Sequence, residues 1–136
     1  MGRILAIDHG KKRCGIAVTD PMRMIGSPLT TVDTEKVFEF LHDYFQKETV
    51  DLLLVGYPTN IQGEATDATP LVDRFIEQCR KKFPSLELRT WDESFSSRKA
   101  MQTLVQSGVK KKDRRQKGAL DQVSAAVILQ EYLQNL

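Results

Sequence analysis

The first 20 residues restrict the fold more than any other stretch of this chain. Residues 3–8 and 13–19 are apolar runs of strand length, and four residues that include Gly10 join them. A connection this short suits two antiparallel neighbours. We therefore expect the chain to begin with a β-hairpin.

Strand and helix patterns alternate after the hairpin. Residues 27–33 suit a short third strand, with Pro28 confined to its start. Apolar residues then recur at helical spacing over residues 37–45, and Thr34 is the predicted N-cap. The continuous apolar run DLLLVG, residues 51–56, is typical of a strand that is covered on both faces.

The second half of the chain continues the alternation. A second helix is expected over residues 68–79, a strand over 86–91, a third helix over 96–107 and a last helix from about Ala119. This order predicts an α/β domain over residues 1–136, with a mixed sheet that starts as an antiparallel hairpin, continues with parallel strands and has helices on both faces. It is the element order of the RNase H-like fold.

Composition excludes several classes of protein. The 136 residues are 28% charged and 40% hydrophobic, which is ordinary usage for one globular domain. The sequence has neither a run of roughly 18 apolar residues nor a secretory signal pattern, so we expect a cytoplasmic protein without a membrane partner. Cys14 and Cys79 lie among apolar residues and are predicted to be buried reduced thiols.

Positive charge is concentrated in one segment. Residues 109–118, VKKKDRRQKG, have a net charge of +5, whereas the remainder of the chain has a net charge of −3. This segregation predicts a local anion-binding surface. A solvated basic loop is the simpler alternative.

Acidic residues stand where the predicted elements end or begin. Asp8 ends the first strand, and Asp92 and Glu93 end the last one. Asp92 and Glu93 cannot both serve one site on a regular strand, because neighbouring residues point to opposite faces, and periodicity alone does not choose between them. Asp121 is expected in the first turn of the last helix, on the face that continues through Ala125 and Ile128.

The position of Asp121 has two interpretations. It can serve the helix dipole, as acids in a first turn commonly do. The helix face that carries Asp121 continues into small and apolar residues, however, so a metal ion shared with Asp8 is the more specific hypothesis. Carboxylates suit Mg²⁺ or Mn²⁺, and two such ions can activate water and stabilise the leaving oxygen of a phosphodiester. Lys11, Lys12 and Arg13 can extend the phosphate-binding surface.

Four segments in order resemble the YqgF/RuvX family of RNase H-like nucleases, which is related to Holliday junction resolvases. They are AIDHGKKRCGIAVTD, LLVGYPTNIQGEATDAT, WDESFSS and RRQKGALDQVSAAVILQEYL, and together they cover nearly the whole chain. The resemblance implies that Asp8, Glu93 and Asp121 are the catalytic, metal-binding acids, and it favours Glu93 over Asp92. The loop residues Gly56, Pro58, Asn60 and Gly63 match a family loop expected beside the site.

The sequence departs from the family after the acidic dipeptide. The family usually has an arginine and a threonine pair there, whereas this chain has Ser94, Phe95, Ser96 and Ser97. Arg98, one turn on, is the candidate replacement for the basic contact. The complete set of predicted substrate-binding residues is Lys11, Lys12, Arg13, Arg98, Lys110, Lys111, Lys112, Arg114, Arg115 and Lys117.

The resemblance implies that the protein processes the 5′ end of precursor 16S ribosomal RNA, so structured RNA is the expected partner. A resolvase that acts on branched DNA is the alternative enzyme, because fold and acids would be shared. A nucleic-acid-binding module without catalysis is the alternative from another class. The sequence leaves the oligomeric state open.

Overall fold

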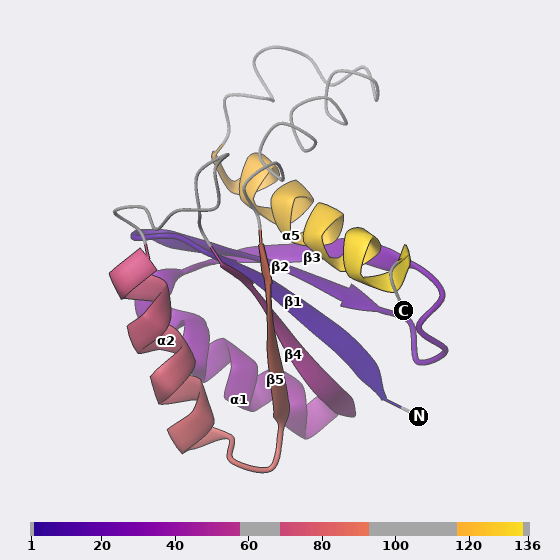
Figure 1. Ribbon diagram of the computed structural model, residues 1–136, viewed down its shortest axis with the longest axis horizontal. Helices are drawn as coiled ribbons and strands as arrows, with labels where there is room; N and C mark the ends of the chain where they lie inside the picture. Colours follow the sequence, from indigo (N-terminus) through magenta and orange to yellow (C-terminus); the bar gives the residue numbers. More distant parts are fainter. Residues whose placement is uncertain (1, 58–68, 93–116, 135–136) are drawn as a thin grey trace.

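A five-stranded sheet forms the centre of the protein. The computed structural model describes residues 2–57, 69–92 and 117–134, and the sheet has the strand order β3-β2-β1-β4-β5 (Figure 1). The strands are β1 (Arg3–His9), β2 (Arg13–Thr19), β3 (Gly26–Asp33), β4 (Val50–Tyr57) and β5 (Glu87–Asp92).

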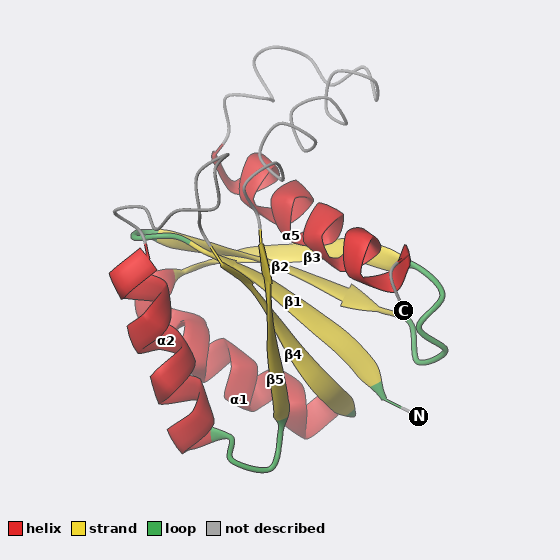
Figure 2. Cartoon of the chain, in the orientation of Figure 1, coloured by secondary structure: helices red, strands yellow, loops and turns green. Residues whose placement is uncertain are grey.

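Helices cover both faces of this sheet. The helices α1 (Val37–Lys47) and α2 (Thr69–Lys82) lie on one face, and α5 (Lys117–Gln134) crosses the other (Figure 2). A single 3-10 turn, η1 (Thr34–Lys36), leads into α1. The predicted third helix, residues 96–107, lies outside the described residues.

Strand directions confirm the predicted mixed sheet. β2 pairs antiparallel with both β1 and β3, whereas β1, β4 and β5 run parallel to one another. The carboxyl ends of the three parallel strands therefore meet at one edge of the sheet. The hairpin connection has three residues rather than the predicted four, because His9 continues β1.

Alternation along the strands produces two separate cores. In β1, Leu5 and Ile7 pack towards α1 and α2, whereas Ile4 and Ala6 pack towards α5. β4 divides its side chains between the same two cores, which confirms that DLLLVG is covered on both faces. Residues 125–129 of α5 are all buried, as their uniformly apolar sequence predicts.

Pro28 occupies a tolerated position in the edge strand β3. It is the third residue of the strand, and the pairing with β2 shifts register there, since Ile16 pairs with Thr30 while Ala17 pairs with Pro28. Proline lacks an N–H group and is compatible with edge strands and bulges. A bulge at the edge of the sheet therefore accommodates this residue.

Two predicted helix starts are wrong. Thr34 is not an N-cap, because it is the first residue of η1 and its hydroxyl bonds the Gly10 carbonyl oxygen instead. The last helix starts at Lys117, two residues before the predicted start, so Asp121 is its fifth residue and lies beyond the first turn.

Both cysteines are free and buried, as predicted. They lie in the core beneath α1 and α2, where burial raises the pKa of the Cys79 thiol to about 12, with a smaller contribution from Cys14. Within the described part of the chain, we find no helix with the length and hydrophobicity needed to span a membrane.

Candidate active site

Asp8 lies at the edge where the parallel strands end. It is the penultimate residue of β1 and is half-buried. Ala6, two residues earlier, packs in the core beneath α5. Because side chains two positions apart share a face of a strand, Asp8 belongs to the α5 face of the sheet.

The residues beside Asp8 in the sheet are glycines. Asp8 pairs with Gly15 of β2, and on the other side Gly56 follows Val55, the last β4 residue paired with β1. Gly56 in turn pairs with Trp91 of β5. The two nearest neighbours of Asp8 across the sheet therefore have no side chain.

Trp91 of β5 is the last residue in this line of neighbours across the sheet, and its side chain lies on the α5 face. Its ring meets that of Tyr132 edge to face, with centroids 5.9 Å apart, and its Nε1 donates a hydrogen bond to Glu131 Oε2 at 2.9 Å. Arg89, two residues earlier on β5, donates from Nη1 to the Tyr132 hydroxyl at 2.9 Å. Trp91 thus has a packing role, and residues 89 and 91 both meet α5.

Asp121 lies on α5, four residues before Ala125 and seven before Ile128, both of which are fully buried against the sheet. Its side chain is outside the described part of the structure. The first four N–H groups of a helix carry most of its positive end, and the dipole effect falls off within the first turn. As the fifth residue of α5, Asp121 is poorly placed to serve the dipole alone.

The predicted metal-binding set extends beyond the described residues. Glu93 lies outside them, and no three described His, Cys, Asp or Glu side chains come together to hold a metal ion. The Asp8 carboxylate, whose neighbours Gly15 and Gly56 have no side chain, nevertheless offers the oxygen ligand that a hard cation takes.

The basic residues nearest to Asp8 lie on the short β1–β2 loop. Lys11 and Lys12 are exposed, and Arg13 begins β2 and is half-buried. Thr34 holds the loop at two points, since its hydroxyl donates to the Gly10 carbonyl oxygen at 2.7 Å and its N–H donates to the Lys12 carbonyl oxygen at 2.9 Å. The loop thus presents two cations from a fixed backbone.

The other predicted substrate-binding residues are not placed by the structure. Lys117 is the first residue of α5, with its side chain outside the described part. The remaining predicted residues, together with Pro58, Asn60 and Gly63 of the family loop, lie outside the described residues: Arg98, Lys110, Lys111, Lys112, Arg114 and Arg115.

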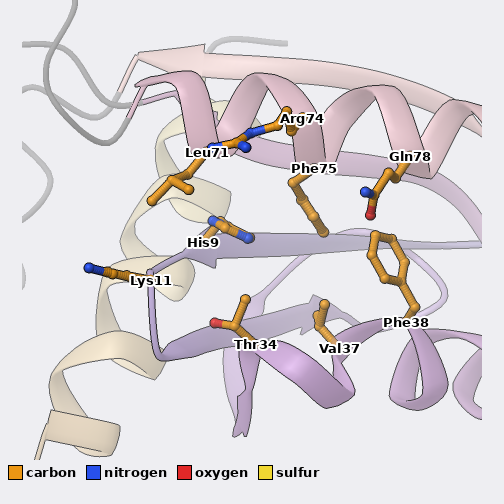
Figure 3. Close-up of a pocket in the computed structure, with 9 residues that line it drawn as sticks. All are labelled: His9, Lys11, Thr34, Val37, Phe38, Leu71, Arg74, Phe75 and Gln78. Atoms are coloured by element: carbon orange, nitrogen blue, oxygen red, sulfur yellow. The ribbon is translucent and has the colours of Figure 1, made fainter.

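A cavity of about 290 Å³ opens on the other face of the same edge (Figure 3). His9 lines this cavity, and it is the last residue of β1 rather than part of the connecting turn. The centroid of its ring lies 4.6 Å from the centroid of the Phe75 ring. Burial lowers the pKa of His9. The sequence pattern did not identify three other lining residues, Phe38, Arg74 and Gln78. Their helical spacing is that of ordinary core or surface residues.

Solved structures with little sequence similarity have the same fold. The fowlpox virus resolvase, solved with Holliday junction DNA, matches with a TM-score of 0.63 at 10% identity, over 98% of this chain and 97% of that one. RuvC from T. thermophilus, solved with a Holliday junction substrate, matches with a TM-score of 0.58 at 10% identity, over 99% and 96%. These matches confirm the predicted RNase H-like fold.

Sequence comparisons identify nearer relatives. A protein from Flavobacterium psychrophilum is 45% identical over 133 residues, covering 98% of this chain and 97% of its own length. One from Amoebophilus asiaticus is 47% identical over 133 residues, covering 98% and 94%. Both carry the name "Putative pre-16S rRNA nuclease". The model of the RuvX family, described as "Holliday junction resolvase", matches residues 2–135, and the chain therefore belongs to this family.

Proposed function

We propose that this chain is a metal-dependent nuclease that processes the 5′ end of precursor 16S ribosomal RNA. The observation that carries the proposal is the placement of Asp8: a half-buried carboxylate at the carboxyl end of β1, flanked in the sheet by Gly15 and Gly56. The names of the relatives at 41–47% identity support the choice of substrate.

Glu93 and Asp121 complete the proposed acidic set with Asp8. On β5, residues 89 and 91 meet α5, and the family resemblance favours Glu93, two positions further along the chain, over Asp92. Asp121 is on the stripe of α5 that continues through the buried Ala125 and Ile128. Both arguments favour the α5 face, to which Asp8 belongs.

Each group has a proposed role in phosphodiester hydrolysis. The three carboxylates would hold Mg²⁺ or Mn²⁺, which when bound supplies Lewis-acid polarisation of phosphate oxygens and a water of lowered pKa. Lys11 and Lys12 bind backbone phosphates and position the strand, and Arg13 extends this surface. Arg98 and the basic residues between 110 and 117 are proposed to bind phosphates further along the substrate. Such a protein would act in the cytoplasm, where buried reduced thiols such as Cys14 and Cys79 persist.

One experiment tests the proposal against its nearest competitor. The description of the family model favours cleavage of a four-way DNA junction as the second candidate activity. The purified protein is incubated with precursor 16S ribosomal RNA and with a synthetic junction, each in Mg²⁺, Mn²⁺ or EDTA. We expect metal-dependent cleavage near the 5′ end of the RNA and slower cleavage of the junction. Preferential junction cleavage would favour the second candidate, and binding without cleavage in any metal would indicate a non-catalytic module.

A further inference from the structure

The cavity beside His9 lies one residue away from the proposed catalytic carboxylate. Asp8 and His9 are consecutive in β1, so their side chains leave the strand on opposite faces. The cavity is bounded by the end of β1, the turn that leads into α1, and α2, as Figure 3 shows. A strand whose phosphate lies at Asp8 can therefore reach this cavity across the end of β1.

Aromatic rings form one side of the cavity. Phe38 and Phe75 have ring centroids 5.3 Å apart, and the His9 ring lies 4.6 Å from Phe75. Phe75 is buried in the core, whereas Phe38 is only partly buried. Unstacked nucleobases bind preferentially on such rings, because every base offers a flat π-face and loses little hydration there.

The charges around the cavity are positive. Lys11 and Arg74 line it, and the Lys82 ammonium lies 5.2 Å from the centroid of the Phe38 ring. The described lining residues include no acid. Gln78 adds an amide that can both donate to and accept from a base edge. The lining thus has positively charged side chains that can bind a phosphate and an amide that can hydrogen-bond to the edge of a base.

The volume limits what can enter. Sites for small molecules commonly measure about 300–1,000 Å³, and this cavity of about 290 Å³ is at the lower end of that range. It has room for one base with part of its sugar and phosphate, but a base-paired segment is too large. A cavity of this volume suits a single nucleotide rather than a duplex.

We propose that this cavity binds one unstacked nucleotide of the substrate strand, adjacent to the phosphate held at Asp8. The proposal rests on the nuclease function proposed above and adds a requirement for a single-stranded position beside the cleavage site. The base stacks on Phe38, while Lys11 and Arg74 contact its phosphate.

The test measures binding rather than turnover. Single-stranded oligonucleotides from the 5′ leader of precursor 16S ribosomal RNA carry one abasic residue, moved a position at a time, and fluorescence anisotropy gives the affinity in EDTA. The proteins are wild type, Phe38→Leu, which keeps an apolar side chain but removes the ring, and Arg74→Gln. Arg80→Gln is the matched control, because Arg80 is an exposed arginine of α2 that does not line the cavity.

We expect one position at which loss of the base weakens binding to wild type by about 5- to 140-fold, the range of one stacked base. At that position the penalty should vanish in Phe38→Leu, while Arg74→Gln should weaken binding to every oligonucleotide more than Arg80→Gln does. A base penalty that is the same in wild type and Phe38→Leu at every position would overturn the proposal.

Two further outcomes are informative. One distinguishes a free nucleotide from a nucleotide of the substrate strand, and the other distinguishes failure of the cavity assignment from failure of the nuclease function. If a free nucleoside monophosphate binds in a Phe38-dependent way while no abasic position matters, the cavity holds a free nucleotide and the proposal is wrong. If one position depends on Phe38 but wild type cleaves no RNA with metal, the cavity assignment stands and the nuclease function fails.

Discussion

The two faces of the sheet differ in that, among the described residues, only the core on the α5 face contains alanines. Ala6, Ala17 and Ala125 are fully buried there, in one cluster with larger residues such as Ile128. On the opposite face, larger residues fill the core beneath α1 and α2, such as Ile7, Leu41 and Phe75. Small residues let α5 approach the sheet closely, whereas bulky ones hold α1 and α2 further away.

Close packing on the α5 face extends to the edge strand. A Cβ atom on Gly26 of β3 would lie 2.8 Å from Cγ of Leu129, so even a methyl group there would force the Leu129 side chain of α5 to shift. The two faces of the sheet also differ at the end of β1. The α5 face presents Asp8 between glycines, and the other face presents a cavity lined by rings. One strand end therefore offers a carboxylate on one side and a cavity lined by aromatic rings and cations on the other.

The largest expected effect follows from the carboxylate on the α5 face. Asp8→Asn keeps the shape of the side chain but removes its charge, so it should reduce RNA cleavage by about 10²- to 10³-fold or more, the loss typical when one electrostatic stabiliser is removed. The circular dichroism spectrum should not change. Asp43→Asn, at an exposed position of α1, is the control and should cleave normally. Wild-type turnover in Asp8→Asn would remove this residue from the mechanism.

The packing difference between the faces predicts opposite sensitivities to side-chain size. Leu41→Ala should lower the free energy of unfolding by about 2–5 kcal/mol, because it leaves a cavity beneath α1. Ala125→Leu should lower it by about 1–3 kcal/mol, because the tightly packed α5 face has no room for the larger side chain. Urea unfolding measures both. A fully stable Ala125→Leu protein would show that α5 is not closely packed on the sheet.

Removal of metal should reveal repulsion at the α5 face. If Asp8, Glu93 and Asp121 converge, the metal-free protein holds like charges together, so Asp121→Asn should melt at a higher temperature than wild type in EDTA. Mg²⁺ should reverse the order, because a ligand at 100 times its Kd stabilises the folded state by about 2.7 kcal/mol and the variant binds it less well. Equal destabilisation of Asp121→Asn with and without Mg²⁺ would contradict the shared site.

The smallest effect concerns the loop that joins β1 and β2. Lys11→Ala with Lys12→Ala should weaken RNA binding and reduce the slope of log affinity against log salt concentration by roughly 0.7–0.9 for each phosphate that the protein no longer neutralises. The matched control removes two charges from the last turn of α2, Arg80→Ala with Lys81→Ala, which lies at the far end of that helix (Figure 1). Equal changes in slope for both pairs would indicate general attraction rather than binding of phosphates at defined positions.

The sequence by itself predicted the elements that the structure describes and their order. Strand and helix periods predicted the hairpin, the doubly covered strand β4 and the buried residues 125–129, because each pattern reports burial within one element. The same local logic placed Asp8 at the end of β1. Glu93 was preferred over Asp92 only through the family resemblance, and its placement remains a prediction.

Only the tertiary structure decided which distant residues meet. Thr34 was predicted to cap its own helix, but its hydroxyl instead bonds Gly10, 24 residues earlier, because that carbonyl lies within reach once β3 has paired with β2. The cavity likewise needs His9, Phe38 and Arg74 from three separate elements. Periodicity records which face of an element is buried, but the neighbour across that face depends on how whole elements pack, and no local pattern encodes this.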